Sequence, residues 1–198
     1  AALYAENKEY LTELDSAIGD ADHGVNLARG FREVNNKIPD MQDKDIANAL
    51  KSTGMTLISK VGGASGPLYG TFFMRAAGPA ADKDELSAAD LLEVLKTGMG
   101  GIVQRGRPNL GDKTMFDVWS PALDALEAAI NADKDLNEAL NETVTAAEEA
   151  MKATIPLQAK KGRASYLGER SIGHQDPGAT SSYMMIKTLA EVVAEDTA

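Results

Sequence analysis

Three aspartates stand within eight residues near the start of the chain: Asp15, Asp20 and Asp22. Carboxylates held about 4 Å apart repel one another by roughly 4 kcal/mol per pair at an effective dielectric constant of about 20. A fold that brings them together therefore needs a cation between them, and hard oxygen ligands select Mg²⁺ or Ca²⁺. The spacing predicts a metal site. Helix capping is the alternative, and one aspartate would suffice for it.

A calcium loop of the EF-hand type is excluded, because the twelfth position counted from Asp20 is Phe31, where that loop needs a bidentate glutamate. Mg²⁺ fits better, since it takes few protein carboxylates and binds substrate phosphates. Three carboxylates could bridge two such ions, which would then bind a di- or triphosphate. Imidazole suits softer metals, so we interpret His23 as a hydrogen-bond donor to phosphate oxygen. The alternative is an incidental surface histidine.

A glycine-rich run follows at 61–70 and reads VGGASGPLYG. Glycines in front of a helix leave backbone N–H groups free to point at an anion, and the helix N-terminus adds a favourable potential. Ser65 adds a hydroxyl. The run is not a Walker A loop, because the chain contains no G-x-x-x-x-G-K-[S/T] string. It predicts phosphate binding, with a flexible turn as the alternative.

Two further runs, 106–117 and 162–180, hold residues that helix packing does not explain. In the first, Met115 and its aromatic neighbours have the spacing of core residues, but Met115 could instead form an apolar wall for a purine ring. In the second, Arg163 or Arg170 could reach phosphate oxygens or stabilise transferred charge. The alternative for this second run is a solvated basic patch.

The overall composition limits the functions that the chain can have. With a net charge of -10, its 198 residues would repel nucleic acid and anionic membrane. It has no cysteine, which excludes disulfides and thiolate zinc sites and fits a reducing, cytoplasmic compartment. We expect a single domain over 1–198, without a transmembrane helix. The chain begins without Met inside an expected helix, so we also expect further N-terminal residues in the full protein.

Nearly every periodic segment has helical spacing, which predicts an all-α fold. Short links favour antiparallel neighbours, and alternate junctions then share one end of the bundle. The four runs at 15–26, 62–70, 106–117 and 162–180 occupy alternate junctions, so we expect them to converge. Ser87 and Asp90 predict a capping box. The eight expected helices cover about 1–14, 24–37, 43–62, 66–78, 88–105, 114–131, 136–154 and 178–194, with a mixed segment from 157 to 177.

Taken together, the motifs resemble the L subunit of dihydroxyacetone kinase, which is its nucleotide-binding subunit. The strings that carry the resemblance are LDSAIGDADHG at 14–24, GGASGPLYG at 62–70, GDKTM at 111–115, GRASYLGER at 162–170 and GHQDPGA at 173–179. The resemblance covers nearly the whole chain, and none of these strings departs from the family pattern.

The resemblance implies an antiparallel eight-helix barrel with the nucleotide at one end. It implies two Mg²⁺ ions held by Asp15, Asp20 and Asp22 and bridged to the phosphates of ADP or ATP. No catalytic base is assigned to this chain, because activation of the acceptor would lie on a partner. The residues implied to touch the nucleotide are His23, Gly24, Val25, Asn26, Ala64, Ser65, Gly106, Met115, Arg163, Asp176, Pro177 and Gly178.

The family has two branches, which differ in how the nucleotide is used. In one, the domain is fused to a dihydroxyacetone-binding domain and ATP exchanges freely. In the other, a separate subunit keeps its ADP, which a phosphohistidine on a phosphotransferase-system protein rephosphorylates. We expect the second branch, with a dihydroxyacetone-binding subunit as partner. The alternatives are a nucleotide-loaded module that docks on a transcription regulator, the nucleotide domain of an ATP-dependent kinase, and a related kinase with another acceptor such as a fatty acid.

Overall fold

The computed structural model describes residues 1–41 and 44–196, and these residues contain helices and no strand. The predicted all-helical fold class is therefore confirmed. The chain divides into two compact units. Unit 1 holds the described residues of 1–12 and 22–107, and unit 2 holds those of 13–21 and 108–196. No helix in the described part of the chain is long and apolar enough to cross a membrane.

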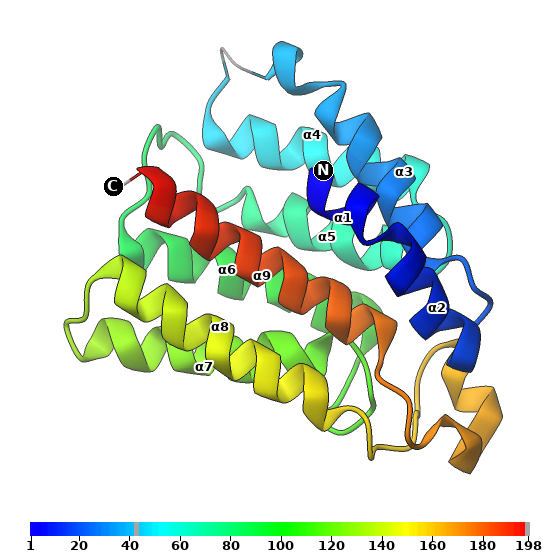
Figure 1. Ribbon diagram of the computed structural model, residues 1–198. Helices are drawn as coiled ribbons and strands as arrows, with labels where there is room; N and C mark the ends of the chain where they lie inside the picture. Colours follow the sequence, from blue (N-terminus) through cyan, green and yellow to red (C-terminus); the bar gives the residue numbers. More distant parts are fainter. Residues whose placement is uncertain (42–43, 197–198) are drawn as a thin grey trace. The chain divides into compact units, whose positions relative to one another are not determined.

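Unit 1 is built from helices that follow one another in sequence and pack as neighbours. Helix α4 contacts α5, α5 contacts α6, and α1 contacts α3; Figure 1 shows α4, α5 and α6 in blue-green to green. Gly54 allows α4 and α5 to approach closely, because a Cβ there would lie 2.7 Å from the carbonyl oxygen of Gly70. The helices are α1 (Ala2–Glu6), α3 (His23–Asn35), η1 (Ile38–Asp40), α4 (Ile46–Lys60), α5 (Ser65–Ala76) and α6 (Ala88–Gly106).

A set of aromatic side chains packs together in unit 1. Tyr4 of α1 lies against Phe31 of α3, with ring centroids 4.7 Å apart. Phe31 in turn meets Phe73 of α5 edge to face, at 6.5 Å. Tyr69 and Phe72, on the same helix as Phe73, are buried as well. Such contacts fix α1, α3 and α5 against each other.

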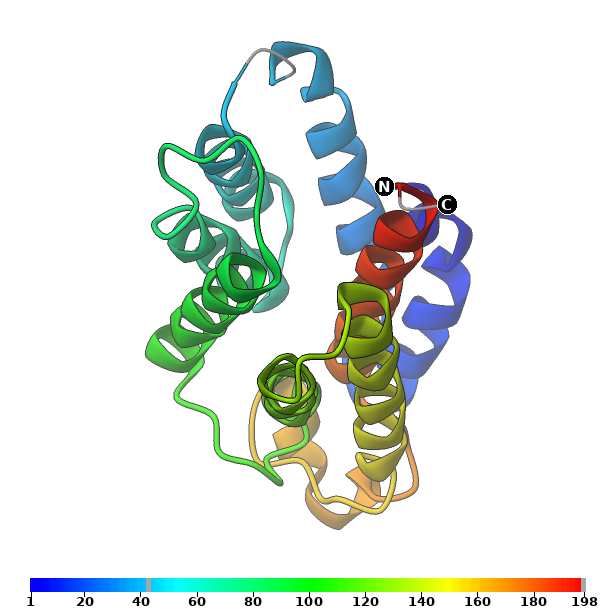
Figure 2. The same cartoon turned by 90° about the vertical axis from the view of Figure 1, so that its left-hand side faces the viewer.

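Unit 2 holds three long helices: α7 (Phe116–Asn131), α8 (Leu136–Ala153) and α9 (Pro177–Asp196), together with the short η2 (Arg163–Ser171). Helix α8 packs on both α7 and α9, and it runs beside α9 in both views (Figures 1 and 2). The α7 face of this core includes the buried Trp119.

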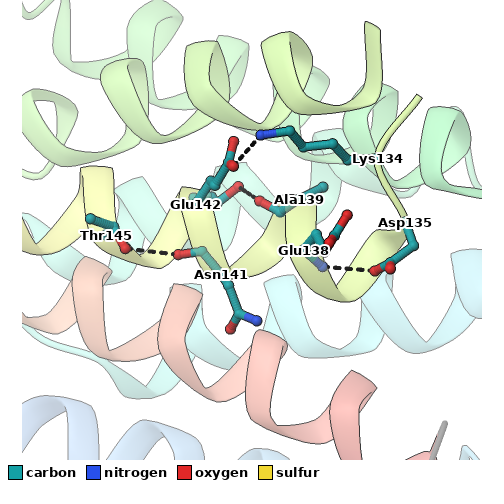
Figure 3. Close-up of polar contacts among 8 residues, drawn as sticks. Lys134, Asp135, Glu138, Ala139, Asn141, Glu142 and Thr145 are labelled. Atoms are coloured by element: carbon teal, nitrogen blue, oxygen red, sulfur yellow. Dashed lines mark hydrogen bonds and ion pairs between the residues drawn. The ribbon is translucent and has the colours of Figure 1, made fainter. Parts of the chain in front are cut away.

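Polar caps fix where helices begin. At the start of α8, the carboxylate of Asp135 accepts a hydrogen bond from the backbone N–H of Glu138 at 2.8 Å, and Lys134 forms an ion pair with Glu142 across the first turns (Figure 3). The predicted capping box is confirmed at α6. The Ser87 hydroxyl accepts from the N–H of Asp90, and the Asp90 carboxylate accepts from the N–H of Ser87.

The expected first helix differs from the structure. It divides at Asn7 into α1 and α2 (Lys8–Ile18), and α2 continues past the expected end near residue 14. The reason is the apolar spacing: Leu11 and Ile18, two turns apart on one face, are both buried, and no helix breaker occurs before Gly19. Asp15 consequently lies on the last turn of α2 and does not follow the helix.

The other expected helices begin and end within about three residues of the observed ones. The expected start of the third helix, near Asp43, lies outside the described residues, and α4 begins at Ile46 after its cap Asp45. The described residues also include the short turns η1 and η2, so nine α-helices and two 3-10 segments replace the expected eight helices.

Candidate functional site

The three aspartates of the opening segment lie close together in space. Asp15 is on the last turn of α2, Asp20 is in the turn that follows, and Asp22 is the N-cap of α3. Each offers a carboxylate oxygen, and these oxygens all lie within 4.8 Å of one another. Asp15 is buried, with 8% of its surface exposed, whereas Asp20 is exposed. A set of hard oxygen donors at this separation fits Mg²⁺ or Ca²⁺.

The turn that carries these aspartates is shaped by its backbone. The N–H of Gly19 donates to the carbonyl of Asp15 at 2.5 Å, which closes the end of α2. Ala21 has a φ of 60°, a left-handed conformation that non-glycine residues adopt infrequently. Asp20 and Asp22 therefore flank Ala21, the residue with the left-handed backbone. The local fold thus gathers carboxylates that repel one another, which is the arrangement expected of a cation site.

A cation from this chain also reaches the aspartate turn. The Nε of Arg163, in η2, lies 2.8 Å from a carboxylate oxygen of Asp20. The side chain of Arg163 is 66% exposed, so this pair contributes little to stability. Its value is positional, because it places a guanidinium next to the proposed ligand set. Two of the predicted site residues, Arg163 and Asp20, are therefore neighbours within unit 2.

Unit 1 brings together the residues at the start of α3 and of α5. The Oγ of Ser65 lies 3.1 Å from Nδ1 of His23. His23 and Asn26 are buried, and Val25 between them is exposed. Ala64 is the N-cap of α5, so its neighbourhood carries the positive end of a twelve-residue helix. The predicted His23, Asn26, Ala64 and Ser65 are thus grouped by the fold, with a helix N-terminus among them.

Gly24 lies at the closest approach of α2 and α3. A Cβ at this position would lie 2.1 Å from the carbonyl oxygen of Lys8 and 2.6 Å from Oγ1 of Thr12. Any larger residue would push the start of α3 away, and with it His23 and Asn26. The glycine is explained by packing, whatever it touches in a complex.

The loop before α7 is held by a buried carboxylate. Asp117 accepts hydrogen bonds from the N–H of Gly111 at 2.5 Å and from that of Thr114 at 2.7 Å. This places Met115 as the N-cap of α7, where it is 5% exposed. Gly106, at the other end of the loop, is the last residue of α6. The structure agrees with the core interpretation of Met115 and leaves its contact with an adenine ring a prediction.

Asp176 immediately precedes the last helix, α9, and is buried among other charged groups. Burial raises its pKa to about 7; the N–H that Ala179 donates and the nearby Lys113 oppose this rise, while the carboxylates of Asp117 and Asp15 add to it. The Asp176 carboxylate accepts from Ala179 at 2.7 Å. Carboxylates from three separate segments of unit 2 therefore influence one another, which agrees with the expected convergence of these segments within that unit.

The remaining predicted residues surround this turn. Pro177 is the first residue of α9 and is buried. A Cβ at Gly178 would lie 3.1 Å from the Asp176 carboxylate and 3.6 Å from the backbone nitrogen of Met115, so Gly178 joins the start of α9 to the start of α7. Neither Lys113 nor Asp117 was predicted from the sequence as a site residue. Both are buried charged residues that hold this loop.

The fold is all-helical, and three clustered carboxylates lie beside an arginine. These features define a class of helical proteins that can hold a divalent cation next to an anionic ligand. The chain belongs to the DAK2 domain family, whose model matches residues 17–191.

Two curated relatives have similar lengths. The chain is 50% identical over 193 residues to the ADP-binding subunit DhaL of the PEP-dependent dihydroxyacetone kinase of Escherichia coli (strain K12), covering 98% of this chain and 92% of that protein. It is 46% identical to the corresponding ADP-binding subunit of the PTS-dependent kinase of Lactococcus lactis, covering 96% of this chain and 90% of that protein. The resemblance to the L subunit is confirmed.

A solved structure shares the fold. The dihydroxyacetone kinase from C. freundii, in complex with AMP-PNP and Mg²⁺, superposes with a TM-score of 0.74 at 27% identity, over 96% of this chain and 32% of that one. That protein is therefore much longer than this chain. That structure contains a nucleotide analogue and magnesium, the two kinds of ligand that the sequence predicts here.

Proposed function

We propose that this chain is the ADP-binding subunit of a dihydroxyacetone kinase, and thus part of a phosphotransferase. The observation that carries the proposal is the aspartate cluster, whose ligand oxygens lie within 4.8 Å of one another. The curated relatives support it, since they are named as ADP-binding subunits and match this chain over nearly its whole length. We further propose that the two units form one nucleotide-binding domain, because the family model spans residues of both.

In this proposal, Asp15, Asp20 and Asp22 hold two Mg²⁺ ions and the nucleotide binds as ADP or ATP. The bound ions would neutralise phosphate charge, which an acidic chain otherwise repels. The side chain of Arg163 would add a donor to phosphate oxygen beside Asp20, and His23 would do the same beside Ser65. The other predicted contacts are Gly24, Val25, Asn26, Ala64, Gly106, Met115, Asp176, Pro177 and Gly178.

The residues of this chain would act by positioning and by charge neutralisation, which are the main requirements of phosphoryl transfer. Two partners complete the proposal. A phosphohistidine of a phosphotransferase-system protein would supply the phosphoryl group, and dihydroxyacetone held on another subunit would receive it. The words "PEP-dependent" and "PTS-dependent" in the names of the relatives support the first partner. No base of this chain is assigned to the acceptor.

The test is retention of nucleotide. We expect mass spectrometry of the purified protein under native conditions, with Mg²⁺ present, to show bound ADP. Asp20→Ala and Asp22→Ala should abolish it, because each removes one ligand of the cluster. Asp124→Ala, which removes an exposed carboxylate on α7, is the matched control and should retain ADP. Retention of ADP by the Asp20 and Asp22 variants would contradict the proposed site. Phosphoryl transfer to dihydroxyacetone in an assay with both partner subunits then tests the activity.

A further inference from the structure

Lys113 is a buried lysine in a strained conformation. Only 1% of its surface is exposed, and its φ of 63° lies in the left-handed region, which is unfavourable for a side chain of this size. Residues held in such conformations persist where the surrounding structure over-determines them, and they cluster at functional sites. A buried ammonium must also find partners for its three N–H donors.

Three backbone carbonyls accept from the Lys113 ammonium. Nζ lies 2.6 Å from the oxygen of Ser171, 3.0 Å from that of Leu157 and 3.4 Å from that of Ile155. These acceptors come from the two ends of one segment, residues 155–173, which we call the strap. The single ammonium therefore ties both ends of the strap to the loop before α7.

Other hydrogen bonds close the strap around this anchor. The N–H of Gly173 donates to the carbonyl of Ile155 at 2.8 Å, and the N–H of Lys160 donates to that of Asp112 at 3.0 Å. The Ser171 hydroxyl accepts from the N–H of Ala159 at 2.9 Å. All of these partners belong to the strap or to the residue next to Lys113. The base of the strap is thus a small hydrogen-bonded core of its own.

The strap carries Arg163. Its side chain is largely exposed, and its Nε reaches Asp20 at 2.8 Å. Gly162 before it has a φ of 63°, a backbone conformation that favours glycine. Because its side chain has little packing around it, the place of Arg163 depends on the course of the strap backbone. Lys113 sets that course by holding both ends of the strap.

We propose that Lys113 is a positioning residue: its ammonium holds the strap so that Arg163 stands beside the aspartate turn, ready for an anionic ligand. The inference deepens the proposed function and rests on it for the identity of the ligand, a nucleoside diphosphate with Mg²⁺. A lysine that only stabilised the fold would lower stability without any specific link to Arg163.

The first experiment needs no nucleotide. Hydrogen exchange of the ligand-free protein should show that Lys113→Met speeds exchange of the amides of Ala159, Lys160 and Gly173 about tenfold, while amides in the middle of α8 and α9 keep their rates. Lys152→Met, which removes an exposed lysine of the same unit, is the control and should leave the strap unchanged. Unchanged exchange in the Lys113 variant would overturn the anchoring role.

The second experiment is a double-mutant cycle on the affinity for ADP at fixed Mg²⁺. We expect Arg163→Ala to weaken binding about tenfold in the wild-type background and less than about twofold in the Lys113→Met background, because the arginine is already misplaced there. Effects that simply multiply would show that Lys113 does not act through Arg163. If Lys113→Met does not fold, Lys113→Gln, whose amide keeps two N–H donors, enters the same cycle.

The two proposals fail in different ways. A wild-type protein that binds no ADP would refute the proposed function, while the exchange experiment would still decide whether Lys113 holds the strap. Tight ADP binding with multiplying effects would refute only the positioning role.

Discussion

Replacing Asp15 by asparagine should make the metal-free protein more stable and should make Mg²⁺ with ADP less able to stabilise it. The change keeps the shape of the side chain and removes one charge from a cluster whose oxygens lie within 4.8 Å of one another. Asp15 is also on the last turn of α2, where the helix dipole disfavours a negative charge. Both effects predict that the neutral side chain stabilises the protein when no cation is bound.

The magnitude follows from the separation. Two unit charges 4.8 Å apart repel by about 3.5 kcal/mol at an effective dielectric constant near 20 and by about 0.9 kcal/mol in bulk water. Asp15 faces two such partners, but Asp20 is exposed and is paired with Arg163, so the lower limit is the better guide. We expect a gain of about 2 kcal/mol in unfolding free energy, or a rise in Tm of about 4–8 °C for a chain of this length.

The sign should reverse when Mg²⁺ and ADP are added. Ligands at about a hundredfold excess over Kd stabilise the protein that binds them by about 2.7 kcal/mol, and a variant with one ligand removed should lose most of this. Thermal unfolding in EDTA and in Mg²⁺ with ADP measures both values, with Asp124→Asn as the control. An Asp15→Asn protein that is less stable than the wild type in EDTA, or that gains as much from Mg²⁺ and ADP, would refute a cation site at this cluster.

Two further predictions concern packing and pH. Gly24→Ala should destabilise the protein by about 2 kcal/mol in urea unfolding, because the new Cβ would meet Lys8 and Thr12 at 2.1 and 2.6 Å; unchanged stability would mean that α2 and α3 part without cost. Asp176 has a pKa of about 7 in the folded protein, above the ordinary value of 3.8, so its contribution to stability is present below pH 4 and is lost as the pH rises towards 7. In EDTA, Asp176→Asn should therefore flatten the fall in Tm between pH 4 and 7, and an unchanged slope would contradict the assignment.

The sequence predicted best those features that depend on neighbouring residues. The capping box of Ser87 and Asp90 could be predicted because both partners lie within one turn. The aspartate cluster could be predicted for the same reason: its three carboxylates lie within eight residues of one another in the sequence, so a single turn is enough to bring them together in space. The predicted end of the first helix was wrong, because the burial of Ile18 outweighed the polar residues around Asp15.

The anchoring of the strap could not be predicted in this way. Lys113 bonds to carbonyls that lie 42, 44 and 58 residues further along the chain. Backbone carbonyls occur at every residue, so no residue type marks the acceptors in the sequence. Lysine next to a helix start is ordinarily exposed, and only tertiary structure shows that this one is not.

Because Lys113 binds main-chain oxygens, it does not require particular side chains at the residues whose carbonyls it contacts. Ile155 and Leu157 offer their carbonyls to Lys113 whatever side chains they carry, so these positions could vary widely, as could the outward-facing Tyr166, whose surface is 87% exposed. We therefore expect the strap to tolerate changes of surface chemistry while its course stays the same. A segment of that kind can acquire a different binding preference without disturbing the arginine that it carries.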